Sequence, residues 1–330
     1  MFPPSGAIGM AVISFDNLLT SFSHEPYNDK MKNVDLCLSW YWEFDSDFVR
    51  MVESACQSRG ISLWQVKPDS LLRTLRAIQT QEIRPSVLFD RANDDLRFDP
   101  IRKWAKDNSI YYINPPQVAF KAEQKDQFHA TLIANGINVP WTILLPSFLD
   151  QQLLDPLDLT PLGTPFVAKP SYAGGGTGVS LNLTTWDQVL QARIEVPDQR
   201  YLLQSHVSTG KINGRETWFR IYYCGGKIYP CWWATDTHIA APVTAYEEAR
   251  LELEKLREIT TVIARLSGLD LFSTEIALTP EGKFVAVDYI NDSIDLRAQS
   301  KAVDGVPDIV LRYIAIALVE MVVRQKQLVK

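Results

Sequence analysis

The sequence feature that most restricts the fold is a run of glycines between two extended segments. Residues 174–178 read Gly-Gly-Gly-Thr-Gly, an apolar strand-like segment at 166–170 leads into them, and extended structure resumes at 179–183. A P-loop and a dinucleotide-binding fingerprint both run from a strand through glycines into a helix. The order here instead predicts a strand, a glycine loop and a second strand.

The glycines suit a phosphate ligand, because they leave backbone N–H groups unobstructed. The four are Gly174, Gly175, Gly176 and Gly178. Lys169 lies on the strand that feeds this loop, between apolar neighbours, where a lysine must be exposed, paired or bound to an anion. A plain flexible hairpin and an edge lysine whose stem covers apolar surface are the alternatives.

The first 115 or so residues alternate between strand and helix patterns, which predicts an open α/β sheet. The expected strands are 34–38, 61–66, 86–89 and 110–113, and the expected helices are 48–56, 71–78 and 101–107. Asp45 is a candidate N-cap for the first helix, and Gly60 is its expected end.

The remaining pattern completes a mixed α/β (α+β) chain. Helices are expected at 117–135, 186–193 and 247–266, and a last one from near 307; strands are expected at 139–145, 201–207, 218–224, 227–233, 272–278 and 283–289. Gly225-Gly226 and Pro280-Glu281-Gly282 are expected to form hairpin turns between neighbouring strands.

Length and charge restrict the function classes. A chain of 330 residues predicts two or three structural units. The formal charge of −6 argues against a broad nucleic-acid-binding surface, so an anionic ligand would need local cations. The four cysteines contain no C-x-x-C pair and are expected to be reduced core thiols.

No targeting or membrane segment is expected. Met1 to Pro4 carry no basic residue, which argues against a signal peptide. The apolar segment at 306–323 contains Asp308, Arg312 and Glu320 and predicts a buried amphipathic helix rather than a membrane span. The default expectation is a cytoplasmic protein.

Acidic and amide side chains suggest a metal site. Glu275 and Asp288 lie on the two strands of the last predicted hairpin, and Asn291 follows Asp288 by three residues. Two acids at neighbouring strand tips are costly if buried and unpaired, and Mg²⁺ with its oxygen ligands would offset that cost. The alternative is an ion pair with Arg220 or Arg297.

Taken in order, these parts resemble the ATP-grasp superfamily. Asn114-Pro115, Lys125 and the segment 136–142 resemble the start of its first ATP-binding lobe, and Lys169 with the glycine loop resembles its second lysine and flexible loop. Gln204, Ser205, His206 and Val207 stand where the family places the adenine hinge. The family more often has Glu-x-Asn at the last strand, where this chain has Asp288-x-x-Asn291.

The resemblance implies an ATP- and Mg²⁺-dependent enzyme. It implies that Lys125 and Lys169 contact phosphates, that the hinge residues bind adenine, and that Glu275, Asp288 and Asn291 bind the metal. Arg220 and Arg297 are candidates for gripping an anionic acceptor, although either one could instead be a structural ion-pair partner.

The lead hypothesis is a carboxylate–amine ligase that forms an amide through an acylphosphate. Its partners would be small-molecule or peptide carboxylates and amines, and the resemblance allows a homodimer. A kinase acting on a small hydroxyl substrate and a nucleotide-binding protein with little catalysis are the alternatives. The expected units are an N-terminal α/β domain at 1–116, a small ATP-binding lobe at 117–205 and a C-terminal metal-binding lobe at 206–330.

Overall fold

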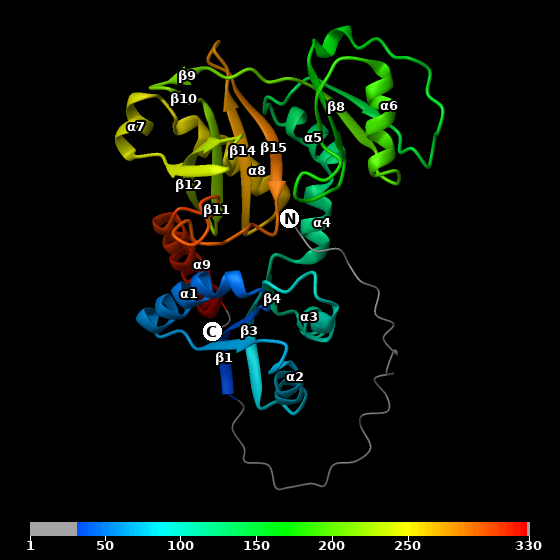
Figure 1. The fold of residues 1–330 in the computed structure, drawn as a ribbon. Helices are drawn as coiled ribbons and strands as arrows, with labels where there is room; N and C mark the ends of the chain where they lie inside the picture. Colours follow the sequence, from blue (N-terminus) through cyan, green and yellow to red (C-terminus); the bar gives the residue numbers. More distant parts are fainter. Residues whose placement is uncertain (1–31, 329–330) are drawn as a thin grey trace.

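The computed structural model describes residues 32–328, which fold around three main sheets (Figure 1). The strands are β1 Lys32–Ser39, β2 Leu63–Val66, β3 Ile83–Asp90, β4 Tyr111–Ile113, β5 Thr142–Leu145, β6 Phe166–Pro170, β7 Ser180–Leu183, β8 Tyr201–Ser205, β9 Lys211–Ile212, β10 Arg215–Glu216, β11 Trp218–Cys224, β12 Lys227–Ala234, β13 Ile239–Pro242, β14 Leu271–Leu278 and β15 Phe284–Asn291. The α-helices are α1 Ser46–Arg59, α2 Leu71–Gln79, α3 Asp99–Asp107, α4 Pro116–Glu123, α5 Lys125–Ala134, α6 Trp186–Glu195, α7 Ala245–Arg250, α8 Glu254–Ser267 and α9 Asp308–Leu328.

The N-terminal sheet is parallel, in the order β2-β1-β3-β4. Its strands form because apolar runs such as Leu36 to Leu38 are buried on both faces, as parallel strands require. Helix α1 ends at Gly60, which adopts a left-handed conformation with φ 62°. The predicted open α/β unit is therefore present.

Two antiparallel sheets build the rest of the chain. The small lobe has the order β5-β8-β6-β7, and the large lobe has the order β13-β12-β11-β14-β15. In Figure 1 the two lobes stand side by side above the N-terminal unit, and α4 and α5 run upward between that unit and the small lobe. The mixed α/β fold class predicted from the sequence is confirmed.

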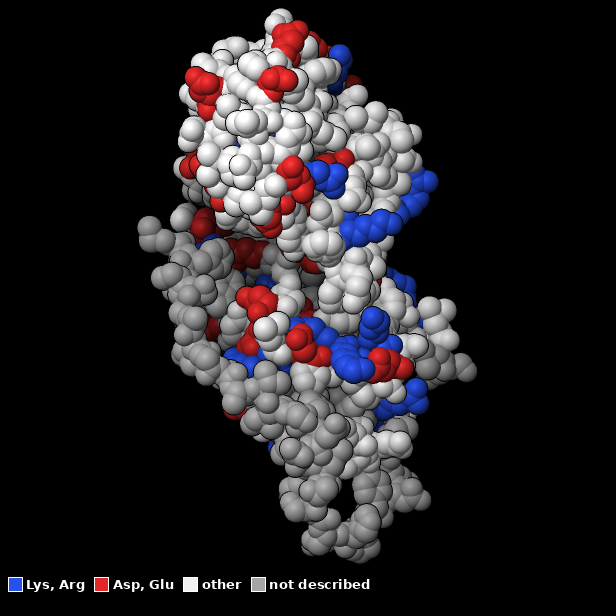
Figure 2. Space-filling view, turned by 90° about the vertical axis from the view of Figure 1, so that its right-hand side faces the viewer, with Lys and Arg blue, Asp and Glu red and all other residues white. Residues whose placement is uncertain are grey.

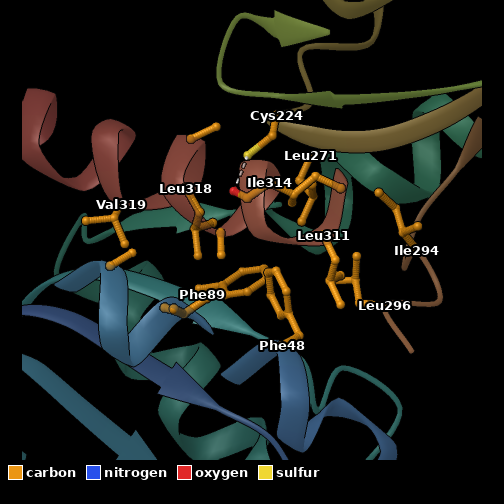
Figure 3. Packing of buried hydrophobic residues seen from close by; sticks show 14 of the residues in the cluster. Phe48, Phe89, Cys224, Leu271, Ile294, Leu296, Leu311, Ile314, Leu318 and Val319 are labelled. Atoms are coloured by element: carbon orange, nitrogen blue, oxygen red, sulfur yellow. Dashed lines mark hydrogen bonds between the residues drawn. The ribbon is translucent and has the colours of Figure 1, made fainter. Parts of the chain in front are cut away.

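Helix α9 joins the N-terminal unit to the large lobe. Its buried side chains Leu311, Ile314 and Leu318 pack in one cluster with Phe48 and Phe89 of the N-terminal unit (Figure 3). The same cluster contains Cys224 and Leu271 of the large lobe. One apolar core therefore fixes the N-terminal unit against the strands that carry the candidate metal ligands.

The surface is hollowed between the small lobe and the N-terminal unit. Figure 2 views the molecule from the side of the small lobe, and acidic side chains line part of this hollow.

Three local predictions were wrong. The expected helix at 117–135 is broken at Gln124, whose extended backbone separates α4 from α5. The expected helix at 247–266 is two helices, α7 and α8. Asp45 makes no side-chain cap, because its carboxylate instead pairs with Arg91 in a buried ion pair at 2.8 Å.

Two further expectations can be compared with the structure. All four cysteines are free and buried, as predicted. Within residues 32–328, no helix combines the length and the apolar character that a membrane crossing requires. The interpretation of Met1 to Pro4 lies outside the described residues.

Candidate functional site

The two acids expected to bind metal lie opposite each other on neighbouring strands. Glu275 of β14 is paired with Asp288 of β15, and Ser273 is paired with Asn291. The ladder is irregular on both sides of the Glu275–Asp288 pair. One irregularity leaves Val287 without a ladder partner, so its carbonyl is available to another group.

The residues present fit a magnesium ion shared with a ligand. The Asp288 Oδ1 atom is buried and has no hydrogen-bond partner among the described residues, which is unusual and leaves a carboxylate oxygen available to a cation. The Asn291 Nδ2 atom is also buried without a partner, but an amide nitrogen donates and does not bind a metal, so Asn291 would bind a metal through its Oδ1 atom. Residues 32–328 contain no cluster of three His, Cys, Asp or Glu side chains placed to hold a metal. A site of two carboxylates and an amide suits Mg²⁺, which commonly takes its other ligands from phosphate and water.

Glu275 is poised between opposing charges. Burial raises its pKa and Asp288 raises it further, while Arg220 and Lys169 oppose that rise. The Trp218 indole N–H donates to Glu275 at 3.1 Å, and Arg220 lies 3.7 Å from its other oxygen. A cation close to this carboxylate would favour its ionised form.

Lys169 projects from β6 toward β15. Its side chain is buried, with 7% of the residue exposed, and its Nζ donates to the Val287 carbonyl at 2.8 Å. Burial lowers the pKa of Lys169 to about 8, and Lys125 lowers it as well, whereas Asp288 and Glu275 raise it. Lys125, Asp288 and Glu275 therefore all lie near enough to influence the charge of Lys169.

Lys125 is the first residue of α5, because the chain turns at Gln124. Its backbone N–H donates to the Ser171 carbonyl at 2.9 Å, and its Nζ lies 3.4 Å from the Ala173 carbonyl. Asp126 accepts from the Ser171 hydroxyl and pairs with Arg200 at 2.6 Å. These contacts attach the base of the glycine loop to the start of α5.

The glycine loop turns between β6 and β7. Thr177 N–H donates to the Gly174 carbonyl, and Val179 N–H donates to the Gly176 carbonyl. Gly178 has φ +70°, and a Cβ there would lie 2.6 Å from Val196 Cγ2, so a side chain does not fit. Gly174, Gly175 and Gly176 are exposed, and a Cβ at Gly174 or Gly176 would meet nothing within 4 Å. The loop base is therefore fixed and its tip is open to a ligand.

The expected hinge residues lie at the end of β8. Gln204 is buried and donates to the Thr142 hydroxyl at 3.0 Å and to the Tyr289 hydroxyl at 3.1 Å. The Ser205 hydroxyl accepts from the Trp141 N–H at 3.1 Å. His206 and Val207 follow the strand, and His206 is exposed.

The two candidate acceptor arginines have different surroundings. Arg220 of β11 donates to the Ser273 hydroxyl and lies 4.8 Å from the Trp233 ring centre. Arg297 is paired with Asp295 at 2.6 Å and with Asp304 at 2.9 Å. Those two acids raise the pKa of Arg297, and they also occupy donors that an anionic acceptor would need.

Sequence reasoning missed two further acids beside the site. Burial and the charge of Asp292 raise the pKa of Glu123 to about 7. Burial raises the pKa of Asp292 to about 6, and its carboxylate accepts from the Asn114 amide at 3.0 Å. Asp292 directly follows Asn291, which was an available signal; Glu123 carried none, because a continuous helix was expected there.

Comparison with known proteins defines the class of the fold. No protein-family model matches the chain, and no curated protein does either. Solved structures of ATP-grasp ligases match over about nine-tenths of the chain. The chain has the ATP-grasp fold, as the resemblance predicted.

Three of these structures illustrate the likeness. One is a D-alanine–D-alanine ligase from Bacillus anthracis complexed with ATP, 12% identical, with a TM-score of 0.59 over 89% of this chain and 97% of that one. Another is the macrocyclase MdnC bound with precursor peptide MdnA from Microcystis aeruginosa MRC, 13% identical, with a TM-score of 0.58 over 88% and 100%. The third is the ATP-grasp ligase PsnB complexed with a minimal precursor, Mg and ADP, 12% identical, with a TM-score of 0.54 over 89% and 98%.

Proposed function

We propose that this chain is an ATP- and Mg²⁺-dependent carboxylate–amine ligase that forms an amide or peptide bond. The observation that carries the proposal is the position of Lys169, whose Nζ donates to the Val287 carbonyl directly before Asp288, the strand partner of Glu275. Lys125 begins the helix whose first N–H donates to the Ser171 carbonyl, two residues after Lys169. Two cations and two carboxylates around one space match a metal-bound polyphosphate better than any uncharged ligand.

The nucleotide would lie between the small and large lobes. Lys125 and Lys169 would contact its phosphates, the exposed glycines would present N–H groups to them, and backbone groups of residues 204–207 would bind adenine. The buried Lys169 can be displaced from the Val287 carbonyl by a stronger anionic partner, because hydrogen bonds between two charged groups exceed those to a neutral carbonyl.

Glu275, Asp288 and Asn291 would hold Mg²⁺, which offsets phosphate charge when it is bound. The protein's own contribution is to keep these oxygen atoms in place through the β14–β15 pairing and through the Trp218 hydrogen bond to Glu275. Positioning and charge neutralisation are the main sources of acceleration in phosphoryl transfer.

The proposed reaction has two steps. A substrate carboxylate oxygen attacks the γ-phosphorus of ATP, the bond to the β-phosphate oxygen breaks, and ADP leaves with an acylphosphate remaining. An amine then attacks the acyl carbon, phosphate leaves with the C–O bonding pair, and the amine loses a proton. A closed glycine loop would keep water from the acylphosphate.

The acceptors would bind beside Arg220. Its guanidinium lies over the Trp233 ring, donates to the Ser273 hydroxyl and lies 3.7 Å from Glu275, a longer distance than the pairs that hold Arg297, so it can grip a carboxylate or the transferred phosphoryl group. Arg297 would act only if Asp295 and Asp304 release it. Because similar structures bind precursor peptides or are D-alanine ligases, we propose an amino acid or peptide as the substrate class.

A phosphate-release screen tests the proposal. Purified protein is incubated with ATP, Mg²⁺ and pairs of amino acids, dipeptides or small carboxylates with amines. Phosphate release that needs one acid and one amine is expected, and it should fall at least about 100-fold in Asp288→Ala and Lys169→Ala. Lys103→Ala, which removes an exposed lysine paired with Asp107, is the matched control. Release with an alcohol alone would indicate a kinase, and ATP binding without turnover of any pair would contradict a ligase.

A further inference from the structure

The hydroxyl of Tyr289 is a buried junction between the two lobes. Tyr289, on β15 of the large lobe, is 1% exposed. Its Oη lies 2.6 Å from His129 Nδ1 of α5 and 3.1 Å from Gln204 Nε2 of β8. Gln204 also reaches Thr142 Oγ1 of β5 at 3.0 Å. Side chains from four elements therefore meet in one chain of hydrogen bonds.

The donor and acceptor roles in this series of hydrogen bonds follow from its end at Thr142. Thr142 Oγ1 donates its proton to the Pro140 carbonyl at 2.8 Å, so it must accept from Gln204. Gln204 therefore turns its NH₂ group inward, and the same nitrogen donates to Tyr289. The Tyr289 hydroxyl oxygen accepts from Gln204, so the hydroxyl proton makes a hydrogen bond only if it points to His129 Nδ1. Burial and the nearby Lys169 lower the pKa of His129 to about 4, which keeps this imidazole neutral and able to accept.

The ring of Tyr289 faces Lys169. The Lys169 Nζ lies 5.3 Å from the ring centre, within the range of a cation–π contact. The same ammonium donates to the Val287 carbonyl, two residues earlier on β15. A hydroxyl held from both sides fixes the plane of the ring, and the ring and the carbonyl together fix the ammonium.

We propose that Tyr289 is a positioning residue for Lys169, and that His129 and Gln204 act through it. This inference rests on the proposed function, in which Lys169 contacts a nucleotide phosphate. Tyr289 and His129 touch neither the nucleotide nor the metal in this proposal. Their effect is on the phosphate-dependent part of nucleotide affinity, and not on adenine binding.

The test compares ADP with adenosine. The full chain and its variants are titrated with each ligand in Mg²⁺ by calorimetry, and the ratio of the two affinities isolates the phosphate contribution. A hydrogen bond to a charged group contributes about 10- to 100-fold in affinity. Lys169→Met should therefore lower the ratio of ADP affinity to adenosine affinity by about that factor. Tyr289→Phe, which frees the ring, is expected to lower the ratio about 3- to 10-fold, and Tyr289→Leu about tenfold or more.

A pair of His129 variants separates positioning from general damage. His129→Asn keeps an acceptor near the Nδ1 position and should retain most of the ratio, whereas His129→Leu removes the acceptor and should behave like Tyr289→Phe. Tyr229→Phe is the matched control, because the Tyr229 hydroxyl donates to the Tyr313 carbonyl away from the site.

The outcomes are distinct. A lowered ratio in Tyr289→Phe and His129→Leu, with unchanged adenosine affinity, supports the inference. An unchanged ratio in every Tyr289 and His129 variant, or an equal loss for both ligands, overturns it while the proposed function stands. A parent protein that binds ADP no better than adenosine overturns the proposed function and the positioning role together.

Discussion

Replacing Lys169 with methionine should stabilise the protein while lowering its affinity for nucleotide. Methionine keeps most of the volume and length of the lysine side chain but carries no charge. A lysine that is 7% exposed and donates to a neutral carbonyl, that of Val287, is costly to keep charged. A site selected for ligand binding is expected to carry such a cost.

The magnitude follows from the pKa. A value of about 8 in the folded protein, against 10.5 ordinarily, corresponds to about 3 kcal/mol of destabilisation while Lys169 is charged. The variant leaves the Val287 carbonyl without its partner, which costs about 1–2 kcal/mol. The expected net gain in the free energy of unfolding is therefore about 1–2 kcal/mol at pH 7.

The gain should depend on pH in a defined direction. Between pH 8 and 10.5 the unfolded chain binds a proton at Lys169 that the folded protein lacks, so the stability of the unmodified protein rises with pH in this window. Lys169→Met removes that dependence. The two proteins should therefore differ most below pH 8 and converge, or reverse in order, near pH 10.5.

Urea unfolding at pH 7 and pH 10 measures both effects. With a slope of about 3 kcal/mol/M, the variant's midpoint should be about 0.5 M higher at pH 7. Lys125→Met is the control, because Lys125 is only half-buried and should give little change. A variant destabilised by more than about 1 kcal/mol at pH 7 would refute the reasoning that Lys169 is held in the folded protein at a cost.

Three further predictions concern affinity and stability. ADP affinity measured without Mg²⁺ should be nearly constant between pH 7 and pH 7.5, where the ADP phosphates are largely ionised, and fall about tenfold between pH 8 and pH 9.5, because Lys169 loses its proton near pH 8 in the free protein; a flat profile in calorimetry would contradict this. Gly178→Ala should lower the thermal midpoint by several degrees, since its Cβ meets Val196, whereas Gly174→Ala, with open space around it, should leave the thermal midpoint unchanged; equal losses of thermal midpoint would contradict the assignment of Gly178 as the fixed base of the loop. Asp45→Asn should cost about 3 kcal/mol in urea unfolding because it leaves the buried Arg91 charge poorly compensated, against less than about 0.5 kcal/mol for Asp107→Asn at an exposed pair.

Regular elements were predictable where one periodicity dominates. The strand leading to Lys169 and the hairpin carrying Glu275 and Asp288 follow from apolar runs with turn residues between them. The break at Gln124 was not predictable, because residues 117–135 contain no proline or glycine that would end a helix. The break is set by tertiary contact, since Lys125 N–H bonds to Ser171 of the glycine loop instead of to the preceding helix.

The site was predictable in its charges but not in its supporting contacts. Lysine, glycine, acid and amide residues stand out in order along the chain, and the resemblance gives each a role. The uncharged residues that hold Lys169 in place do not stand out in the sequence. His129 is separated from Tyr289 by 160 residues, and nothing in either local sequence indicates a hydrogen bond between them. Arg297 shows the opposite case, a charged residue that the sequence marks as a candidate for the site. Only the structure shows that it is paired with both Asp295 and Asp304.

The central claim is that Lys169, Lys125 and the Glu275–Asp288 pair bind one magnesium-bound nucleotide, and its most direct measurement is ADP binding by calorimetry with and without Mg²⁺. We expect Mg²⁺ to strengthen ADP binding at least about tenfold in the parent protein and to have no effect on ADP binding in Asp288→Asn. Lys169→Met and Lys125→Met should each weaken ADP binding both with and without Mg²⁺. Parent-like affinities in all three variants, with the Mg²⁺ effect intact, would contradict the claim.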